Sequence, residues 1–484
     1  MDELRATVRE RMLLPPGLPN PNPTKAAWQD PPHPTVADEQ SPILPETADI
    51  IVIGSGITGC AVSHTLLSDQ SVPNLRVTVL EARQTCSGAT GRNGGHLISD
   101  CSSLVPRLVP ELGEAEALKI AKFSEANILR LKNLISELGE TDRASVELRD
   151  VVGSAVFEDT DMFSEAQAGL GALHQVCPES SIMHKVIPTS DAYEKYRYGC
   201  KVAGAVEQRG AAALWPYKFI TSLFRKMLHE YPERFTLETS TAAKSIDYTN
   251  GEPFPYHITT SRGVIRANKV IHCTNGFAGH LLPNLIGTIY PSRGTMSSQK
   301  PGPSFPNLGG EASWTHFSRA SYDSKTGVFG TGLYYAQQNE QTGDIFIGGE
   351  RQRVADLLSS DDSIVASEAR DNLCAILPKI FRVVEPVGEQ RVWSGIMGFT
   401  SDGLPLVGKL PSEITRRDGD GEWIAAGFNG HGMDKCWLTG EAVARMVLGK
   451  ESSEFPDAFL LRSERLDRCG ADQSADGFMS MLGP

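Results

Sequence analysis

Residues 48–67 read ADIIVIGSGITGCAVSHTLL, and residues 77–83 follow with VTVLEAR. An apolar strand runs into a glycine-rich turn, a helix-like segment comes next, and a second apolar strand ends on Glu81. This order of strand, GxGxxG turn, helix and strand-terminal acid is typical of a dinucleotide-binding βαβ unit. The stretch therefore predicts a nucleotide cofactor at the start of the helix.

Three glycines in this turn have separate tasks. Gly54 permits the tight turn, Gly56 lets backbone N–H groups approach a pyrophosphate, and Gly59 lets the helix pack on the strand. The carboxylate of Glu81 can accept hydrogen bonds from a ribose. We expect cofactor contacts along the turn and the end of the second strand, at Gly54, Gly56, Ile57, Thr58, Gly59, Glu81, Ala82 and Arg83.

A second loop decides which dinucleotide binds. Residues 86–96 read CSGATGRNGGH and follow the ribose-binding strand end directly. A nicotinamide cofactor has no use for a loop there, whereas the ribityl chain and fused rings of a flavin extend back across the start of the first helix. We expect Arg92 to support the phosphate side, and His96 either to face the flavin ring or to be a hydrogen-bonded core histidine. The predicted cofactor is FAD, with contacts from Ala89, Thr90, Gly91, Arg92, Asn93, Gly94, Gly95 and His96.

The core of this loop, GRNGG at residues 91–95, resembles that of the FAD-dependent D-amino-acid oxidase / glycine oxidase superfamily. It is most similar to the gamma-glutamylputrescine oxidase branch and to many fungal FAD-dependent oxidoreductases. Two later segments resemble the same superfamily: TSDGLPLVG at 400–408 is similar to its TPDGLPxIG segment, and WIAAGFNGHGM at 423–433 to its GxxGHG segment. CTNG at 273–276 resembles its second flavin-side segment. The resemblance adds expected FAD contacts at Asn275, Gly276, Gly430, His431, Gly432 and Met433.

The resemblance implies an α/β fold in which a Rossmann-type FAD-binding domain is interleaved with a mixed-sheet substrate domain of α+β type. Residues 1–47 are expected to form a proline-rich arm, and residues 451–484 a C-terminal tail. The remaining segments divide into an FAD-binding domain at 48–145, 231–290 and 395–450, and a substrate-binding domain at 146–230 and 291–394.

Apolar periodicity predicts the elements outside the nucleotide motif. Residues 112–139 carry one apolar face and predict a long helix. Residues 15–47 are rich in proline and predict an extended arm, which Trp28 can fix to the body. Further helices are expected at 216–230, near 361–374 and at about 434–447. A strand pair is expected at 146–157, and strands at 235–239, 256–260, 267–279, 327–336, 344–349 and 390–393.

Bulk composition limits the partners. The chain has 484 residues, about two domains in length, and its 46 basic and 59 acidic residues leave a net charge of -13. That charge argues against nucleic acid or an anionic membrane as a partner. No apolar run reaches the roughly 20 residues that cross a bilayer, and the charged N-terminus does not resemble a secretory signal. Nine scattered cysteines predict no metal site and a reducing compartment, so we expect a cytoplasmic protein.

Three positions depart from the sarcosine-oxidase-like branch of the superfamily. The cysteine that tethers flavin there falls on Gly395, so the resemblance implies FAD that is not covalently bound. The lysine that helps activate dioxygen falls near Phe346. The lysine that binds the substrate carboxylate falls on Asp434, which reverses a charge.

Three residues are candidates for catalysis. Asp434 either holds a cationic end of the substrate or is an acid favoured by the dipole of the helix that follows. His431 can hydrogen-bond the flavin or shape its turn. Arg293, in a PxRG segment similar to one that passes the flavin ring, either binds a substrate acid or forms a structural ion pair.

The function implied is oxidation of a C–N bond in an amine or amino-acid-like molecule, by hydride transfer to flavin N5, with dioxygen as the acceptor. Two alternatives stay open. One is a flavin-dependent dehydrogenase or hydroxylase of secondary metabolism. The other is a non-catalytic FAD-binding assembly factor. The oligomeric state is not predicted.

Overall fold

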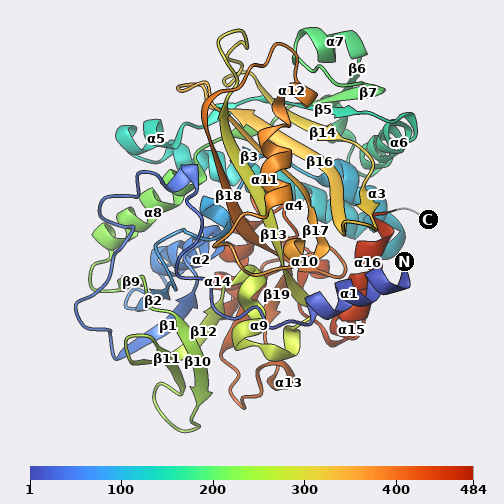
Figure 1. Ribbon diagram of the computed structural model, residues 1–484. Helices are drawn as coiled ribbons and strands as arrows, with labels where there is room; N and C mark the ends of the chain where they lie inside the picture. Colours follow the sequence, from blue (N-terminus) through green and yellow to red (C-terminus); the bar gives the residue numbers. More distant parts are fainter. Residues whose placement is uncertain (483–484) are drawn as a thin grey trace.

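Two large sheets form the framework of the protein (Figure 1). The computed structural model describes residues 1–482. Within these residues one sheet has eight strands and the other nine, and the chain crosses between the sheets several times. This architecture of mixed sheets and covering helices is the expected α/β fold class.

The first sheet contains the predicted nucleotide motif. Strand β1 (Thr47–Ile53) lies between β2 (Val77–Leu80) and β12 (Val264–His272), and all three run parallel. Because parallel strands end at the same edge, the loops after β1, β2 and β12 meet there. The other strands of this sheet are β9 (Phe235–Glu238), β10 (Ala243–Tyr248), β11 (Tyr256–Thr260), β19 (Leu406–Lys409) and β20 (Glu422–Ala426).

Helices cover one face of the first sheet, and they approach it closely. Helix α2 (Ile57–Ser68) packs between β1 and α14 (Cys436–Val447). A Cβ atom on Gly440 of α14 would lie only 2.6 Å from the Cβ of Ala61, so the two helices touch through small residues. Helices α8 (Pro216–Glu230) and α4 (Glu114–Ser136) complete this layer.

The second sheet contains both parallel and antiparallel strand pairs, and a cavity separates it from the first sheet. Its strand order is β18-β13-β17-β16-β14-β5-β7-β6, with β15 (Ser321–Asp323) beside β16. Helices α11 (Ser367–Cys374), α12 (Leu377–Ile380) and α7 (Thr189–Glu194) pack on its outer face. The strands are β5 (Val152–Phe157), β6 (His184–Ile187), β7 (Gly204–Gln208), β13 (Ile289–Lys300), β14 (Ala312–Phe317), β16 (Val328–Gln338), β17 (Ile345–Arg353) and β18 (Val387–Thr400).

The two ends of the chain pack together, which the sequence did not predict. Helix α1 (Asp2–Met12) lies against α16 (Ala471–Ser480), and Arg5 and Arg9 form ion pairs with carboxylates of α16 (Figure 1). Residues 13–46 then cross the molecule as a largely extended arm. The expected tail is therefore a folded segment, with α15 (Ser463–Leu466) preceding α16.

The arm is fixed by Trp28, as predicted. Its indole is buried, stacks on Phe346 with ring centroids 3.9 Å apart, and meets Trp215 edge-on. Its Nε1–H donates to the Asn93 carbonyl at 2.6 Å. The arm is therefore part of the core, and it contacts the loop expected to hold FAD.

Several predicted boundaries need correction. The helix expected over 112–139 is α4, and Gly113, with φ 82°, separates it from α3 (Cys101–Leu112). The helix near 361–374 begins only at Ser367, because Asp362 binds the arm. Residues 146–157 are not a strand pair, since β4 (Arg149–Asp150) joins β8 (Ala212–Ala213) and β3 (His96–Leu97) in a small separate sheet. The helix expected from 434 begins at Cys436.

The strand expected at 267–279 is wrong beyond His272, where β12 ends; a short 3-10 helix at Asn275–Phe277 and helix α9 (Ala278–Leu281) follow instead. The remaining element predictions are confirmed. The helix expected at 216–230 matches α8 at both ends. The strands expected at 327–336, 344–349 and 390–393 are β16, β17 and part of β18. The domain boundaries themselves stay a prediction. In the described part of the chain, no helix has the length and apolar character needed to span a membrane.

Candidate functional site

A cavity of about 1210 Å³ lies between the two sheets. The loops at the carboxyl edge of the first sheet line one side, and strands β5, β7, β14, β16 and β17 line the other. It brings together most of the residues expected to contact the cofactor: Gly54, Gly56, Ile57, Thr58, Glu81, Ala82, Arg83, Ala89, Thr90, Arg92, Asn93, Gly94, His96, Asn275, Gly430, His431, Gly432 and Met433.

Four of the expected glycines do not line the cavity. A Cβ atom on Gly59 would lie 2.0 Å from the Gly54 carbonyl oxygen, and one on Gly91 would lie 2.2 Å from the Cys86 carbonyl oxygen. The same close approach holds for Gly95 against Leu214, at 2.6 Å, and for Gly276 against Met397, at 2.5 Å. These glycines let the lining loops pack closely and do not themselves face the cavity.

The turn after β1 has the geometry that a pyrophosphate requires. Gly54 has φ 111°, and a Cβ there would lie 2.6 Å from the Cys273 carbonyl oxygen. Gly56 is the N-cap residue of α2, and no side chain caps that helix. The first N–H of the helix, on Ile57, donates to Thr90 Oγ1 at 3.0 Å, which ties the second loop to the turn. The start of α2 therefore opens toward the cavity.

Glu81 is oriented by the same turn. Its Oε2 accepts from the backbone N–H and the hydroxyl of Ser55, at 3.1 and 2.6 Å, and its Oε1 accepts from the Arg83 N–H at 2.9 Å. These bonds hold the carboxylate at the strand end, where a ribose is expected.

The two arginines of the lining are committed to the protein itself. Nη1 of Arg83 donates to both carboxylate oxygens of Asp362 at 2.9 Å. Arg92 donates from Nε to the Ser87 carbonyl at 2.7 Å and from Nη1 to the Ser394 carbonyl at 2.8 Å. Burial lowers the pKa of Arg92 to about 10, against the opposing effect of Asp362. Both side chains fix the second loop to the arm and to β18.

The GHG turn is joined to its neighbours by two asparagines. Asn275 Oδ1 accepts from the Gly427 N–H at 3.0 Å, and Asn429 Oδ1 accepts from the Thr400 N–H at 2.8 Å. Gly430 has φ 79°, which the turn requires. The three segments similar to the superfamily, near 275, 400 and 430, therefore form one connected side of the cavity.

Asp434 does not lie in the first turn of a helix, which corrects the reading as a helix-dipole acid, and it is already paired within the protein. It precedes Lys435, the N-cap residue of α14, and it is buried. Its carboxylate accepts from Lys435 Nζ at 2.8 Å and from the Ser124 hydroxyl at 2.7 Å. Lys435 also donates to Asp100 at 2.7 Å, so one ammonium bridges two carboxylates.

The charges in this group shift one another's pKa values. Burial works to raise the pKa of Asp100, but the charges of Lys435 and His431 and the hydrogen bonds of the group together outweigh it and lower that pKa to about 2. Burial raises the pKa of Asp434. The two carboxylates together raise the pKa of Lys435, against its own burial. His431, half-exposed at the cavity, lies with Nδ1 3.6 Å from Asp100 Oδ2.

Arg293 does not line the cavity. Its side chain is buried on the other face of β13, where Nη2 donates to Asp356 at 2.8 Å and Nη1 to the Asp361 carbonyl at 3.1 Å. Of its two readings, the structural ion pair is the one observed.

Phe346 does not line the cavity either, because its ring stacks on the indole of Trp28. Gly395 does line the cavity, and a Cβ there would lie 3.1 Å from Arg92 Cβ. The position of the family's flavin-tethering cysteine therefore carries no thiol.

Glu350 is the most informative residue that the sequence did not single out. It ends the apolar run of β17, lines the cavity, and accepts from the Thr295 N–H at 2.6 Å and from Gln352 Nε2 at 2.8 Å. Burial raises its pKa to about 8. An acid directly after the sequence FIGG was the available signal.

His96 and the arm complete the lining. The imidazole Nε2 bonds the Ala336 carbonyl at 3.0 Å, and burial lowers the pKa of His96 to about 4, so the ring is neutral at pH 7. It is thus both hydrogen-bonded and at the cavity. Gly17, Leu18 and Pro19 of the arm also line the cavity, which no motif indicated.

The lining fits FAD. Five buried polar atoms at the cavity have no hydrogen-bond partner within the described residues, and three of them belong to segments that follow strands of the first sheet: Arg83 Nε, Thr274 Oγ1 and His280 Nε2. Together with the open start of α2 and the acid at the end of β2, they offer groups for phosphate, ribose and ring contacts.

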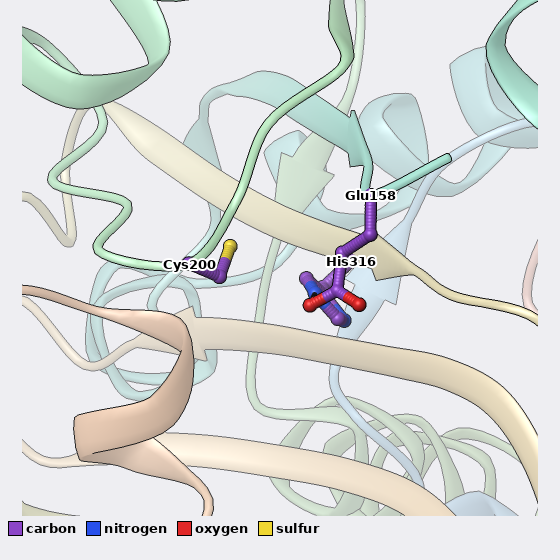
Figure 2. A group of neighbouring side chains, drawn as sticks. All are labelled: Glu158, Cys200 and His316. Atoms are coloured by element: carbon purple, nitrogen blue, oxygen red, sulfur yellow. Dashed lines mark hydrogen bonds and ion pairs between the residues drawn. The ribbon is translucent and has the colours of Figure 1, made fainter. Parts of the chain in front are cut away.

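A second polar cluster lies away from the cavity (Figure 2). His316 Nε2 and Glu158 Oε1 are 2.9 Å apart, with Cys200 on a neighbouring loop. Thr315 and Phe317 line the cavity, so the alternation of side chains along β14 places His316 on the opposite face. Within residues 1–482 it is the one group of three such side chains close enough to share an ion.

Comparison with known families agrees with this geometry. The model of the DAO family, described as FAD dependent oxidoreductase, matches residues 49–446. The chain belongs to this family. The protein is therefore an enzyme, an oxidoreductase whose cofactor is FAD.

Relatives of this chain are distant in sequence but similar in extent. A probable oxidoreductase OrdL of Rhizobium meliloti is 22% identical over 85% of this chain and 86% of its own. The same-named protein of Haemophilus influenzae is 21% identical, over 84% of each.

Solved structures share the fold. Glycine oxidase from Geobacillus kaustophilus aligns with a TM-score of 0.64 and 19% identity, over 86% of this chain and 99% of its own. L-proline dehydrogenase from P. horikoshii aligns with a TM-score of 0.64 and 20% identity, over 87% and 99%.

Proposed function

We propose that this enzyme oxidises a C–N bond of an amine or amino-acid-like small molecule, with dioxygen as the electron acceptor. The observation that carries the proposal is the shared cavity, because loops suited to FAD and the inner face of the second sheet line the same space. FAD supplies the oxidising chemistry when bound, by taking up a hydride at N5. The protein's part is to hold a substrate carbon close to the cofactor and to exclude water.

The inner face of the second sheet suits that task. Phe157, Val206, Phe317 and Leu333 point into the cavity from four strands, and Leu170 adds to them from α6 (Thr160–Val176). Hydride transfer from a C–N carbon needs a neutral amine, an aligned C–H bond and a dry pocket more than an acid–base pair. An apolar wall opposite a cofactor site meets that need.

The proposed reaction removes two electrons from the substrate and passes them to dioxygen. The substrate carbon loses a hydride and its nitrogen loses a proton, which leaves an imine. Water hydrolyses the imine to a carbonyl compound and ammonia or an amine. Two electrons and two protons reduce dioxygen to hydrogen peroxide. The likeness of the fold to a glycine oxidase and an L-proline dehydrogenase supports a substrate of this kind.

The cofactor is proposed to be held without a covalent bond, because glycine stands at position 395. Contacts are proposed from the turn after β1, the loop 86–96, Asn275 and the turn 430–433. Among the residues considered for catalysis, His431 is the one that is half-exposed at the cavity.

One experiment tests the reaction class. The purified FAD-loaded protein is kept free of oxygen and mixed with amines, polyamines and the D- and L-forms of amino acids, while the visible flavin band is followed. Loss of the band with at least one of these compounds, followed by its return and peroxide formation in air, is the expected result. A band that no compound bleaches would contradict C–N oxidation, and bleaching that air does not reverse would identify a dehydrogenase.

A further inference from the structure

The cavity contains no free cation that a substrate carboxylate could pair with. Its arginines are Arg83 and Arg92, and within the described residues no lysine lines it. Both guanidinium groups are buried and bonded to Asp362 or to backbone carbonyls. Releasing either one would separate the second loop from the arm. An amino acid entering this cavity would therefore leave its carboxylate unpaired and desolvated, which is costly.

The histidines of the cavity do not replace that cation. Burial lowers the pKa of His96, to about 4, and it also lowers the pKa of His184 and of His280. His431 already faces the carboxylate of Asp100. A substrate carboxylate placed beside it would also meet that acid and Asp434.

Among the described residues, the one acid that the second sheet contributes to the cavity has no counter-ion. Glu350 accepts two hydrogen bonds from neutral donors, and within the described residues no cation lies within ion-pair distance of it. Arg293, the nearest cation on β13, is turned away to Asp356. Of the other acids at the cavity, Asp100 and Asp434 are paired with Lys435, and Glu165 is exposed on α6. Glu81 also has neutral donors only, but it lies at the end of β2, where a ribose is expected. Glu350 is thus oriented by Thr295 and Gln352 and is still able to accept a proton.

From these contacts we infer that the substrate is an amine without a carboxylate on the reacting carbon, and that Glu350 binds its nitrogen. This inference rests on the proposed C–N oxidation and narrows it. When Glu350 is ionised, its carboxylate accepts a proton from the substrate ammonium, which becomes the neutral amine that hydride loss requires, while the side chain becomes a carboxylic acid. The apolar wall then holds the carbon chain.

The raised pKa of Glu350 supports this role, because a carboxyl group with a pKa near 8 takes a proton from an ammonium more readily than an exposed glutamate does. A carboxylate with an ordinary pKa would instead stabilise the charged ammonium.

Matched pairs that differ only by the carboxylate test the substrate class. Phenethylamine and phenylalanine, isopentylamine and leucine, and cadaverine and lysine are each mixed with the oxygen-free FAD-loaded protein, using both enantiomers of each acid. We expect the amine of a pair to bleach the flavin about 10–100-fold more efficiently than the acid. Amino acids that bleach as well as their amines would overturn the inference and leave the proposed function standing.

Binding provides an answer even where nothing is oxidised. The shift of the flavin band on adding each amine, and on adding 3-phenylpropionate as an apolar carboxylate, gives two sets of apparent affinities. Tighter binding of the carboxylate would overturn the inference, whereas absence of bleaching by every compound would contradict the proposed function alone.

Variants test Glu350 itself. For the amine that bleaches best, Glu350→Gln is expected to lower the rate of flavin reduction about tenfold or more and to remove a pH dependence that wild type shows near pH 8. Glu389→Gln, the same change at an exposed position on β18, is the control and should retain the wild-type profile. FAD content is measured for both. A Glu350→Gln protein that keeps its FAD, its rate and its pH profile would exclude the role.

Discussion

Ionisable side chains are buried at two places beside the cavity. At one of them Lys435 neutralises two buried acids, and at the other Glu350 stands without a cation. Buried charges are tolerated only when they are paired or neutralised by a pKa shift. The two places therefore respond to substitution and to pH in opposite ways.

Removing the ammonium of Lys435 should be strongly destabilising. Lys435→Met leaves Asp100 and Asp434 facing each other without a counter-ion, and breaking a buried pair in this way costs about 3–5 kcal/mol. Urea unfolding of the FAD-loaded protein measures the difference. Lys450→Met removes a surface ammonium and should cost no more than about 1 kcal/mol. Equal losses of unfolding free energy in the two variants would mean that the buried cluster contributes no more to stability than a surface ion pair.

Glu350 should make stability fall as pH rises. Its folded pKa is raised to about 8 from an ordinary value of 4.5, so the folded state keeps a proton that the unfolded chain has lost. The sign follows from linkage: stability decreases wherever the folded state binds more protons. Between about pH 5 and pH 8 the melting temperature of wild type should therefore drop more than that of Glu350→Gln. Parallel curves for the two proteins would rule out the shift.

Residue-level prediction from sequence succeeded where a backbone motif dictates the residue type. Gly54 and Glu81 occupy their expected places because the βαβ turn admits few alternatives. It left two readings open at Asp434 and at Arg293, whose partners Ser124 and Asp356 are far away along the chain. No local pattern encodes such pairs.

Among the elements, α2 is the one whose position the site depends on most. It contacts β1, β2, α8 and α14, and its start opens onto the cavity. Close packing through glycine places it there. A small change in this helix should therefore affect both stability and cofactor binding.

Gly59→Ala tests that dependence. The added Cβ would lie 2.0 Å from the Gly54 carbonyl oxygen, so the helix must move away from the turn. We expect a loss of at least about 1–3 kcal/mol in unfolding free energy and weaker FAD retention during gel filtration. Gly171→Ala in α6, where a Cβ meets nothing within 4 Å, should be neutral or stabilising. A Gly59→Ala protein that binds FAD normally would disprove the packing argument.

The arm is an element without regular structure, and Trp28 carries most of its packing. Trp28→Ala removes a fully buried ring and should cost about 3–5 kcal/mol. It also releases the Asn93 carbonyl, so FAD should dissociate faster. Trp28→Phe keeps the stack on Phe346 but loses the donated hydrogen bond. Its stability and its rate of FAD release should lie between those of wild type and Trp28→Ala. Thermal melts and FAD release rates give the order, and an arm that merely covers the surface would show no loss for either variant.

Helices and strands were predicted well where the apolar periodicity is strong. They were predicted poorly where packing against a distant part of the chain determines the structure. Helix α8 was placed at both ends, because its apolar face and Pro216 are local signals. Helix α1 was missed, since its apolar residues Leu4, Val8 and Met12 matter only once α16 covers them. Residues 146–157 were read as one pair because nothing local shows that the chain changes sheet at Val151.

At the scale of the whole molecule, the cavity lies where the two sheets face each other, so FAD should join them. Both the loops of the first sheet and β16 and β17 of the second line it. A ligand that binds the folded state alone stabilises all of the protein that folds with it.

Added FAD should therefore raise the melting temperature in a single transition. At a free FAD concentration about 100 times the dissociation constant, the gain is about 2.7 kcal/mol. Protein stripped of its cofactor and titrated with FAD shows this gain, while NAD at equal concentration should have little effect. An equal response to NAD would contradict the assignment of the second loop to a flavin.

The fold class and the cofactor could be predicted from short sequence motifs whose residues meet at one edge of the first sheet. No motif predicted the residues on the substrate side of the cavity. The strands that form the apolar wall are separated by long stretches of chain, and Phe157, Val206 and Leu333 share no spacing. Only the three-dimensional arrangement shows that they line one cavity together with Glu350, which lies on the same sheet.

The arm also constrains the order in which the chain can fold during synthesis. Its partners lie later in the chain and are made after it: Asn93, then Trp215, Phe346 and finally Ser394. Until residue 394 has been made, residues 13–46 have no complete surface to dock on, and their prolines keep them extended meanwhile. Docking of the arm is then a late event in folding, and it completes the support of the loop 86–96 after the first sheet's nucleotide motif has formed.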